Sequence, residues 1–183
     1  QQVTSPSESQ TWLRDRVPAP TNAFELTLGT GYTQGLGMIR GGASVPSVAT
    51  PGMGFDLAGH WRLDERFSIG LGGQYQELFA PNGAGARGLT STIALAYHLN
   101  PELRVDPWLE IGTGYRMLWE DKTSGPNVLR HGFELARARV GADFRVSPEL
   151  AIGPVIGADM NMFLWENART SETITDVRLN TFL

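Results

Sequence analysis

Apolar and polar residues alternate with a period of two through most of the chain. In residues 67–72, one face collects Phe, Ile and Leu while the other collects Ser and two Gly. The same alternation recurs over residues 53–62, 89–99 and 150–164. A period of two is typical of β-strands whose two faces meet different surroundings. These segments therefore predict strands rather than helices.

A repeat of about 40 residues organises these strands. Leu28, Ile69, Ile111 and Ile152 stand at matching places in similar segments, 41, 42 and 41 residues apart. Such regularity indicates repeated supersecondary units. Each unit consists of a strand, a long connection, a second strand and a short polar turn. The predicted turns are residues 64–66, 100–102 and 147–149, and the longer Gly-, Pro-, Asn- and Ser-rich connections are residues 33–52, 80–88, 120–130 and 166–172. Four such hairpins predict eight antiparallel strands.

Alternation alone does not say which face of the strands lies inside. A soluble barrel places its apolar face inward, whereas a membrane barrel places it outward. The polar face here is rich in Gly, Ala and Ser, which suit a narrow interior, and several strands are long enough to cross a bilayer at a tilt. Aromatic residues also gather at strand ends, as in the girdles of membrane barrels, although aromatics favour strands in general. The predicted girdle is Tyr32, Trp61, Tyr75, Tyr97, Trp108, Tyr115, Trp119, Phe144 and Trp165, with Phe79 beside it.

The predicted fold is therefore all-β, an eight-stranded antiparallel up-and-down transmembrane β-barrel over residues 23–183. Residues 1–22 are predicted to form a periplasmic segment that is flexible or a short helix, for which Ser7 and Gln10 form a candidate capping box leading to Arg16. Two strands are irregular: the sixth needs a β-bulge near Leu135, and the eighth has Val177, Leu179, Thr181 and Leu183 facing lipid, which turns Phe182 the other way.

The chain from residue 23 to residue 183 resembles the OmpA/OmpX type of small outer-membrane barrels. The resemblance rests on strand count, on the contrast between short turns and long loops, and on the alternation. It implies a bacterial outer membrane, with lipid as the surrounding partner. Members of that type end their last strand on a terminal Phe, whereas Phe182 is penultimate here.

Composition narrows the chemistry. The chain has no Cys, which excludes disulfides and thiolate sites, and its net charge of −4 argues against nucleic acid as a partner. No apolar stretch approaches the roughly 18–20 residues of a transmembrane helix. Of 15 basic residues only Lys122 is a lysine. Arg is preferred where a cation must be paired in a restricted space, while a GC-rich genome also favours it.

An ion-pair network is predicted inside the barrel, because eight strands enclose only enough room for side chains. The residues placed there are Glu25, Asp56, His60, Arg62, Glu110, Arg116, Glu134, Arg137, Arg139, Asp143, Asp159 and Arg178. Arg–carboxylate pairs in layers would plug the interior. The alternative is a narrow path for ions or small solutes.

No motif indicates catalysis, a metal site or a cofactor. The first long loop carries the apolar residues Leu36, Met38, Ile39, Val45 and Val48, which either mark a partner site or fold back over the barrel mouth. The main hypothesis is a structural protein or one that binds another envelope or surface protein through its loops. Alternatives are a channel, a soluble lipocalin-like ligand binder and a lipid A-modifying enzyme that uses His131 with Ser124 or Ser171.

Overall fold

The computed structural model describes residues 16–79, 85–168 and 170–183 and is almost entirely β-sheet. The strands are β1 (Phe24–Thr33), β2 (Gly35–Arg40), β3 (Ala43–Ser44), β4 (Gly52–Arg62), β5 (Phe67–Phe79), β6 (Gly85–His98), β7 (Val105–Glu120), β8 (Val128–Arg145), β9 (Ala151–Ile152), β10 (Val155–Asn167), β11 (Ser171–Thr173) and β12 (Leu179–Phe182), with a four-residue helix α2 (Val45–Val48). The helix predicted from Ser7 lies outside the described residues, except for Arg16, which forms an isolated β-bridge with Leu103.

The strands form one antiparallel sheet in the order β1-β4-β5-β6-β7-β8-β10-β12-β2-β3, with β9 on β8 and β11 on β10. Most neighbours in the sheet are also neighbours in sequence, so the arrangement is up-and-down. Only Gln34 separates β1 from β2, and the two strands have different partners. β1 pairs with β4, while β2 pairs with β12. Gln34 and Leu183 extend the second pairing by exchanging backbone hydrogen bonds of 3.1 and 3.0 Å.

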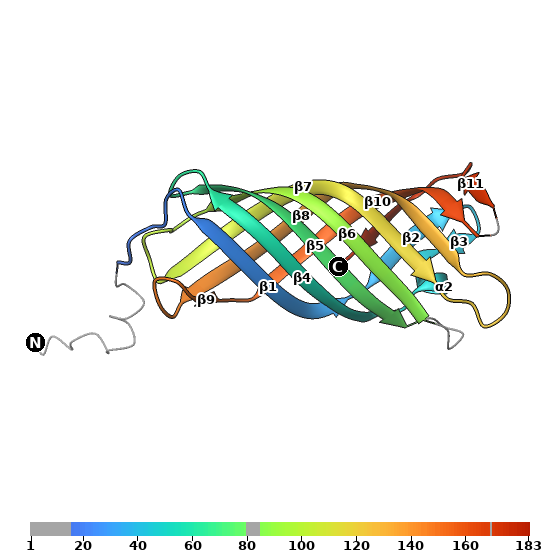
Figure 1. The fold of residues 1–183 in the computed structure, drawn as a ribbon, viewed down its shortest axis with the longest axis horizontal. Helices are drawn as coiled ribbons and strands as arrows, with labels where there is room; N and C mark the ends of the chain where they lie inside the picture. Colours follow the sequence, from blue (N-terminus) through green and yellow to red (C-terminus); the bar gives the residue numbers. More distant parts are fainter. Residues whose placement is uncertain (1–15, 80–84, 169) are drawn as a thin grey trace, which may run out of the picture.

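The strands wrap around one long axis, and the two ends of the molecule differ (Figure 1). One end, called the turn end, carries the short connections β4–β5, β6–β7 and β8–β9. The other, called the loop end, carries β2, β3, α2, β11 and the longer connections. Lys122 lies exposed at the loop end, where its backbone N–H donates to Asn127 Oδ1 at 3.2 Å. The predicted separation of short turns from long loops is confirmed.

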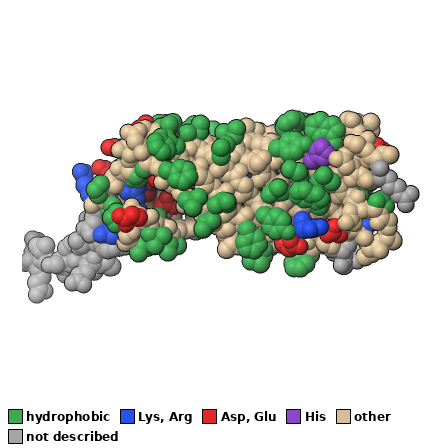
Figure 2. Space-filling view, in the orientation of Figure 1, with side chains coloured by type: hydrophobic (Ala, Val, Ile, Leu, Met, Phe, Trp, Pro, Cys, Tyr) green, Lys and Arg blue, Asp and Glu red, His purple; other side chains and the backbone are tan. Residues whose placement is uncertain are grey.

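The two faces of the sheet differ as predicted. Along β6 every inward residue is buried, while Leu89, Ile93 and Leu95 on the outward face are 38%, 57% and 40% exposed. Figure 2 shows hydrophobic side chains over the middle of the outer surface and charged ones toward the two ends. Apolar side chains therefore face outward, and most of the buried charged groups face inward.

A β-bulge in β8 is confirmed where the alternation required one. Ala136 pairs with Met160 of β10, but the next pair is Glu134 with Asn161, and the pairing with β7 shifts at the same place. Leu135 and Ala136 are consequently both exposed on the outer face. The extra residue lets the apolar side chains before and after it stay on the outer face.

The last two hairpin strands show two further departures from simple alternation. The predicted strand over residues 150–164 is split into β9 and β10, because Pro154 has no N–H for a ladder bond. Phe182 points inward and is buried, as predicted, while Leu179 and Leu183 are exposed. Val177 was predicted to face lipid, and this was wrong, since it packs against buried apolar residues at the loop end.

Candidate functional site: the polar interior and its two ends

The interior is shaped by facing strands with side chains of unequal size. β5 and β6 contribute small inward residues, namely Gly70, Gly72, Thr90, Thr92, Ala94 and Ala96. β7 and β8 contribute long charged ones, namely Glu110, Arg116, Glu134, Arg137 and Arg139. A Cβ atom added at Gly70 would collide with the His60 ring. The small residues thus make the room that the charged side chains occupy.

Arg116 is fully buried and is held by groups from three other strands. Its Nη1 donates to Asp159 Oδ2 at 2.8 Å, and its Nη2 donates to Gln76 Oε1. Its guanidinium lies 3.5 Å from the ring centroid of Phe182, whose backbone N–H donates to Asp159 Oδ1 at 2.9 Å. A buried cation requires such partners, because the desolvation penalty is otherwise uncompensated. Through Phe182, this pair also fixes the position of β12.

The second buried pair depends on the β8 bulge. Arg137 Nε lies 2.9 Å from Glu134 Oε1, and Thr92 Oγ1 donates to Glu134 Oε2 at 2.6 Å. Residues three apart on a regular strand point to opposite faces. The extra residue at Leu135–Ala136 brings both charged side chains to the inner face, so the bulge creates this ion pair.

A third group joins the strands β4, β7 and β8 closer to the turn end. His60 Nε2 lies 3.2 Å from Glu110 Oε2, and Arg139 Nη2 lies 2.5 Å from Asp56 Oδ1. Arg139 Nε also approaches Glu110 Oε1 at 3.9 Å, which connects the two pairs. The predicted mixing of both charge signs inside the sheet is therefore what the structure contains.

Nearest the turn end, the interior contains a buried pair that the sequence analysis missed. His98 Nδ1 lies 2.8 Å from Asp106 Oδ2, and Arg145 Nη2 approaches the same oxygen at 3.6 Å. Arg62 and Glu25 form a separate pair at 2.7 Å. The sequence did contain a signal for this pair. His98 has the inward parity of β6, and Asp106 lies four residues before Glu110 on β7 and so has the same inward parity.

Two site predictions were wrong. Arg178 was placed inside, but its side chain is 59% exposed and pairs with Asp176 at 3.2 Å, because it precedes β12 and strand alternation does not apply there. Trp108 was placed in the outer girdle, but its Nε1 donates to Asp143 Oδ1 at 3.0 Å on the inner side. Gly141 makes this possible, since a Cβ there would collide with the indole. The other predicted network residues all lie on inner faces.

An apolar cluster closes the interior at the loop end. This loop-end cluster consists of Ile39, Val45, Val48, Ala49, Leu78, Ala86, Leu118, Phe163, Ile174 and Phe182. The Ser44 side chain caps α2 by accepting from the Ser47 N–H at 3.3 Å, which directs Val45 and Val48 inward. Among the five apolar residues of the first loop, Ile39, Val45 and Val48 thus fold back over the mouth. Leu36 and Met38 are each 38% exposed.

The eight remaining girdle residues lie on outer faces near strand ends. They are Trp61, Tyr97 and Phe144 toward the turn end, and Tyr32, Tyr75, Tyr115, Trp119 and Trp165 toward the loop end. Two such groups on the outer surface are the arrangement expected of side chains with one end in hydrocarbon and the other in water.

His131 belongs to the loop-end group and is surrounded by partners. Its Nδ1 hydrogen-bonds Tyr115 Oη, its Nε2 pairs with Asn167 Nδ2 at 3.2 Å, and its ring stacks on Trp165 at 5.3 Å between centroids. Ser171 Oγ donates to Asn167 Oδ1 at 2.7 Å. The side-chain amide of Asn167 therefore lies between Ser171 and His131. A serine nucleophile and its histidine base would instead be in direct contact.

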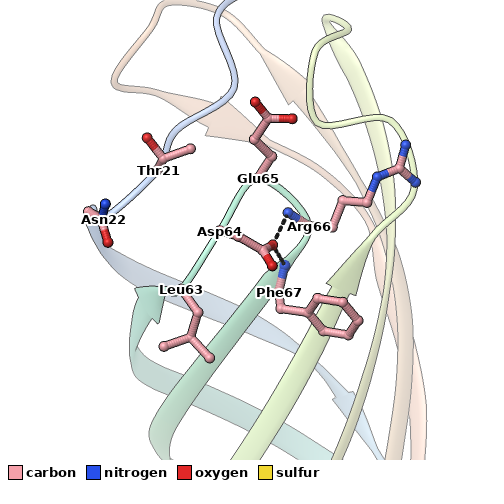
Figure 3. A pocket seen from close by; sticks show the side chains of 7 residues that line it. All are labelled: Thr21, Asn22, Leu63, Asp64, Glu65, Arg66 and Phe67. Carbon is pink, nitrogen blue, oxygen red and sulfur yellow. Dashed lines mark hydrogen bonds between the residues drawn. The ribbon is translucent and has the colours of Figure 1, made fainter.

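At the turn end, residues 16–23 run alongside the short turns. The Val17 N–H donates to Glu102 O at 2.9 Å, and Ala23 O accepts from the Arg62 N–H at 2.8 Å. Between this segment and the β4–β5 turn lies a hollow of about 460 Å³, lined by Thr21, Asn22 and residues 63–67 (Figure 3).

The β4–β5 turn is held by one carboxylate. Asp64 Oδ1 accepts from the backbone N–H groups of Phe67 and Arg66, both at 2.7 Å, as Figure 3 shows. These two hydrogen bonds, the one from Phe67 first, lower the pKa of Asp64 below its ordinary value of 3.8. The hollow is thus bounded by a turn whose polar groups are already used to hold its own backbone.

Two solved structures resemble this chain. Neisserial surface protein A matches with a TM-score of 0.55 and 9% sequence identity, over 87% of this chain and 96% of that one. Outer membrane protein OprG from Pseudomonas aeruginosa matches with a TM-score of 0.56 and 11% identity, over 88% and 89%. Searches of family models and of curated proteins find no match.

Among the described residues, no helix has the length and apolar character needed to cross a bilayer. The two structural neighbours are small outer-membrane β-barrel proteins. At 9% and 11% identity these neighbours show the fold of this chain but not its family or role. Membership of the OmpA/OmpX type stays a prediction. The chain therefore has the fold of small outer-membrane β-barrel proteins.

Proposed function

We propose that this chain is an integral protein of a bacterial outer membrane. The observation that carries the proposal is the inverted distribution of side chains, with apolar residues exposed outside and ion pairs buried inside. In water such exposure of Leu, Ile and Phe would be unfavourable, while in lipid it is the stable arrangement. A soluble lipocalin-like barrel requires the reverse, and the buried Arg116–Asp159 pair argues against it.

Within that membrane the chain acts as an eight-stranded barrel with a filled interior. β1 and β2 together count as one strand, and β9 and β10 as another, which with β4, β5, β6, β7, β8 and β12 makes eight. The pairing of β12 with β2 brings the last strand back to the first at the loop end. Eight strands leave an interior that side chains fill, and the ion pairs described above fill it.

The role of the barrel is structural, or adhesive through its loop end, with the N-terminus in the periplasm. Support comes from the asymmetry of the two ends, since long connections on a rigid scaffold are the usual carriers of binding. Leu36 and Met38 are exposed near this end. A partner surface there would be another envelope or surface protein.

Membrane contact is tested by fluorescence quenching with brominated lipid. Two single-tryptophan variants form a matched pair, one retaining Trp61, 48% exposed on the outer face, and one retaining inward Trp108. After folding into vesicles, brominated chains should strongly quench Trp61 and leave Trp108 nearly unchanged. Equal quenching of both residues, or of neither, contradicts the proposal.

The loop-end role needs a separate test. Deleting residues 122–126 shortens the β7–β8 connection without touching either strand. Cells carrying this variant, with Leu36 and Met38 replaced by Ser, should fold the barrel but lose adhesion or partner recruitment. If every phenotype of the parent is kept, the loop-end role is rejected and the structural role alone remains.

A further inference from the structure

The hollow beside the β4–β5 turn, called the turn-end hollow, owes its shape to the direction in which the chain enters β1. Asn22 has a φ of 50°, in the left-handed region that Asn adopts more readily than most residues. The chain changes direction there, so Thr21 and Asn22 stand beside the turn, as Figure 3 shows. Together with residues 63–67 they bound about 460 Å³, a volume typical of small-ligand sites.

One wall of the turn-end hollow is apolar and continues into the outer surface of the sheet. Leu63 and Phe67 form this wall and are 52% and 40% exposed. The Phe67 ring packs against Tyr97, an outer-face aromatic residue of the turn end, with 5.0 Å between the ring centroids. The opposite wall, residues 21–22, is polar. In a bilayer, a hollow that joins an apolar outer face to a polar rim lies at the level of the lipid headgroups.

The cation at the rim of the hollow is Arg66. Its Nη1 donates to Tyr97 Oη at 3.0 Å and to the Leu99 carbonyl oxygen at 3.4 Å, which holds the guanidinium beside the aromatic residues. Both hydrogen bonds use one nitrogen, and among the described residues Nε and Nη2 have no acceptor. A guanidinium with spare donors is a good partner for a phosphate group, which it can meet through two parallel hydrogen bonds.

The opposite charge comes from Glu65. Its side chain is exposed, and its carboxylate accepts no hydrogen bond from any described residue. The pKa of Arg66 is raised first by the hydrogen bond to Tyr97 and further by nearby carboxylates, Glu65 among them, so the two charges act on each other. Asp64 Oδ1 already accepts from the N–H groups of its own turn. Glu65 and Arg66 therefore offer one negative and one positive charge to a ligand.

We infer that the turn-end hollow binds a phospholipid headgroup that carries both a phosphate and a primary ammonium. The inference rests on the proposed membrane location, which brings lipid to this rim. The phosphate pairs with the free edge of the Arg66 guanidinium, and the ammonium donates to the Glu65 carboxylate. The first carbons of the acyl chains lie along the apolar wall of Leu63 and Phe67.

Charge and hydrogen bonding separate this ethanolamine headgroup from two others. A choline headgroup has the same charges, but its quaternary ammonium has no N–H to donate to Glu65. A glycerol headgroup keeps the phosphate and lacks the cation, so its negative charge approaches the Asp64 and Glu65 carboxylates without compensation. The hollow should therefore hold ethanolamine lipids in preference to both.

Local enrichment of a lipid is measured by tryptophan quenching with brominated lipids that differ only in their headgroup. A single-tryptophan variant retains Trp61, which lies on the outer face two residues before Leu63. It is folded into phosphatidylcholine vesicles that contain a minor fraction of brominated phosphatidylethanolamine, phosphatidylcholine or phosphatidylglycerol. The ethanolamine lipid should quench Trp61 about twofold more than either other lipid, since exposed ion pairs are individually weak. A variant that retains Trp119, toward the loop end, should be quenched equally by all three.

Changing the charge of Glu65 should change the preferred lipid. Glu65→Gln should reduce quenching by the ethanolamine lipid to the level of the choline lipid. Glu65→Lys adds a second cation beside Arg66 and should make the glycerol lipid the strongest quencher. The matched control is Glu149→Gln, which removes an exposed carboxylate from the β8–β9 connection and should leave the ethanolamine preference unchanged.

Equal quenching of Trp61 by the three lipids overturns the inference, and so does an ethanolamine preference that survives Glu65→Gln. Both results leave the membrane proposal standing, because Trp61 is still in contact with lipid chains. An equal ethanolamine preference at Trp119 means enrichment around the whole barrel and also rejects the site. If none of the three lipids quenches Trp61, the membrane proposal itself fails.

Discussion

At the scale of single residues, the chain uses arginine where a cation must be enclosed. Arg116 and Arg139 each reach a carboxylate on another strand, and Arg137 reaches Glu134 across the β8 bulge. A planar fork with several donors suits such fixed partners better than an ammonium does. Lys122, the one lysine, is exposed at the loop end. These three arginines are thus enclosed and paired, as the first of the two predicted reasons for the excess of Arg requires.

Removing one member of the central pair should destabilise the barrel strongly. Arg116→Met leaves Asp159 buried without its cation, and breaking a buried pair costs about 3–5 kcal/mol. Arg178→Met is the matched control, because this exposed pair is worth about 0–1 kcal/mol. Urea unfolding in lipid vesicles, followed by tryptophan emission, measures both. Similar losses for the two variants would contradict the described interior.

Much of the interior was predictable from parity, and the exceptions have physical reasons. Glu110 and Asp159 lie on strands with clear alternation, so their inward direction followed directly. The inward placement of Arg178 was wrong because this residue precedes its strand, and nothing in the local pattern marks where β12 begins. The outward placement of Trp108 followed from its aromatic character, although it has the same parity as inward Glu110.

At the scale of elements, irregularities in the strands set up the interior. The β8 bulge was predictable because the outward residues change parity at Leu135. What it accomplishes was not, since the partnership of Glu134 with Arg137 across the bulge depends on three-dimensional register. The inward packing of α2 could not be predicted from the alternation either. Two apolar residues in a loop can bind a partner or pack into the core, and the sequence pattern is the same in both cases.

Deleting Leu135 should be tolerated, whereas deleting Ile93 from the regular strand β6 should prevent correct folding. Removing Leu135 takes out the extra residue itself, so Ala136 and Glu134 stay opposite Met160 and Asn161 and keep their faces. Removing Ile93 shifts one part of β6 by one position, which turns its apolar side chains inward and its small polar ones outward. Heat-modifiable gel migration after refolding reports both variants. Loss of the heat-modifiable band in the Leu135 deletion would refute the role assigned to the bulge.

The β4–β5 turn should make a pH-dependent contribution. The folded-state pKa of Asp64 is lowered by the N–H groups of Phe67 and Arg66, so its ionised form stabilises the fold above the ordinary value of 3.8. That contribution is lost as the pH falls through the lowered pKa. Asp64→Ala should therefore be less stable than the parent at pH 5, with a difference that shrinks toward pH 2. The readout is the difference between the two urea midpoints, and a constant gap across this range would exclude the carboxylate as the cause.

At the scale of the whole molecule, two different barriers stand in series along the axis. Ion-paired side chains occupy the interior from His98 to Arg116, and the dry loop-end cluster around Val45 lies beyond them. The all-β antiparallel up-and-down sheet and the contrast between the two ends followed from alternation and repeat spacing. The division of the first long strand between two partners, β4 for β1 and β12 for β2, did not, because pairing partners are not encoded in the alternation of a strand.

The folded protein should show no steady conductance in a planar bilayer, because ion-paired side chains fill the interior and the loop-end cluster covers its mouth. Removing only the apolar barrier, with Ile39→Ser and Val45→Ser, should also leave the bilayer silent, since the ion pairs still fill the interior. The control for this double variant is Leu89→Ser on the outer face. Stepwise currents from the parent protein would reject the filled interior and favour the alternative of a narrow channel.

The position of Lys122 has a practical consequence for topology. The chain offers a single side-chain amine, and it projects from the loop end beside Asn127. A bulky amine-reactive label that cannot cross lipid will therefore modify this side chain only on the side of the bilayer that the loop end occupies. Digestion and mass measurement of the fragment containing residue 122 then read the sidedness of insertion in living cells directly, without an epitope or any engineered change.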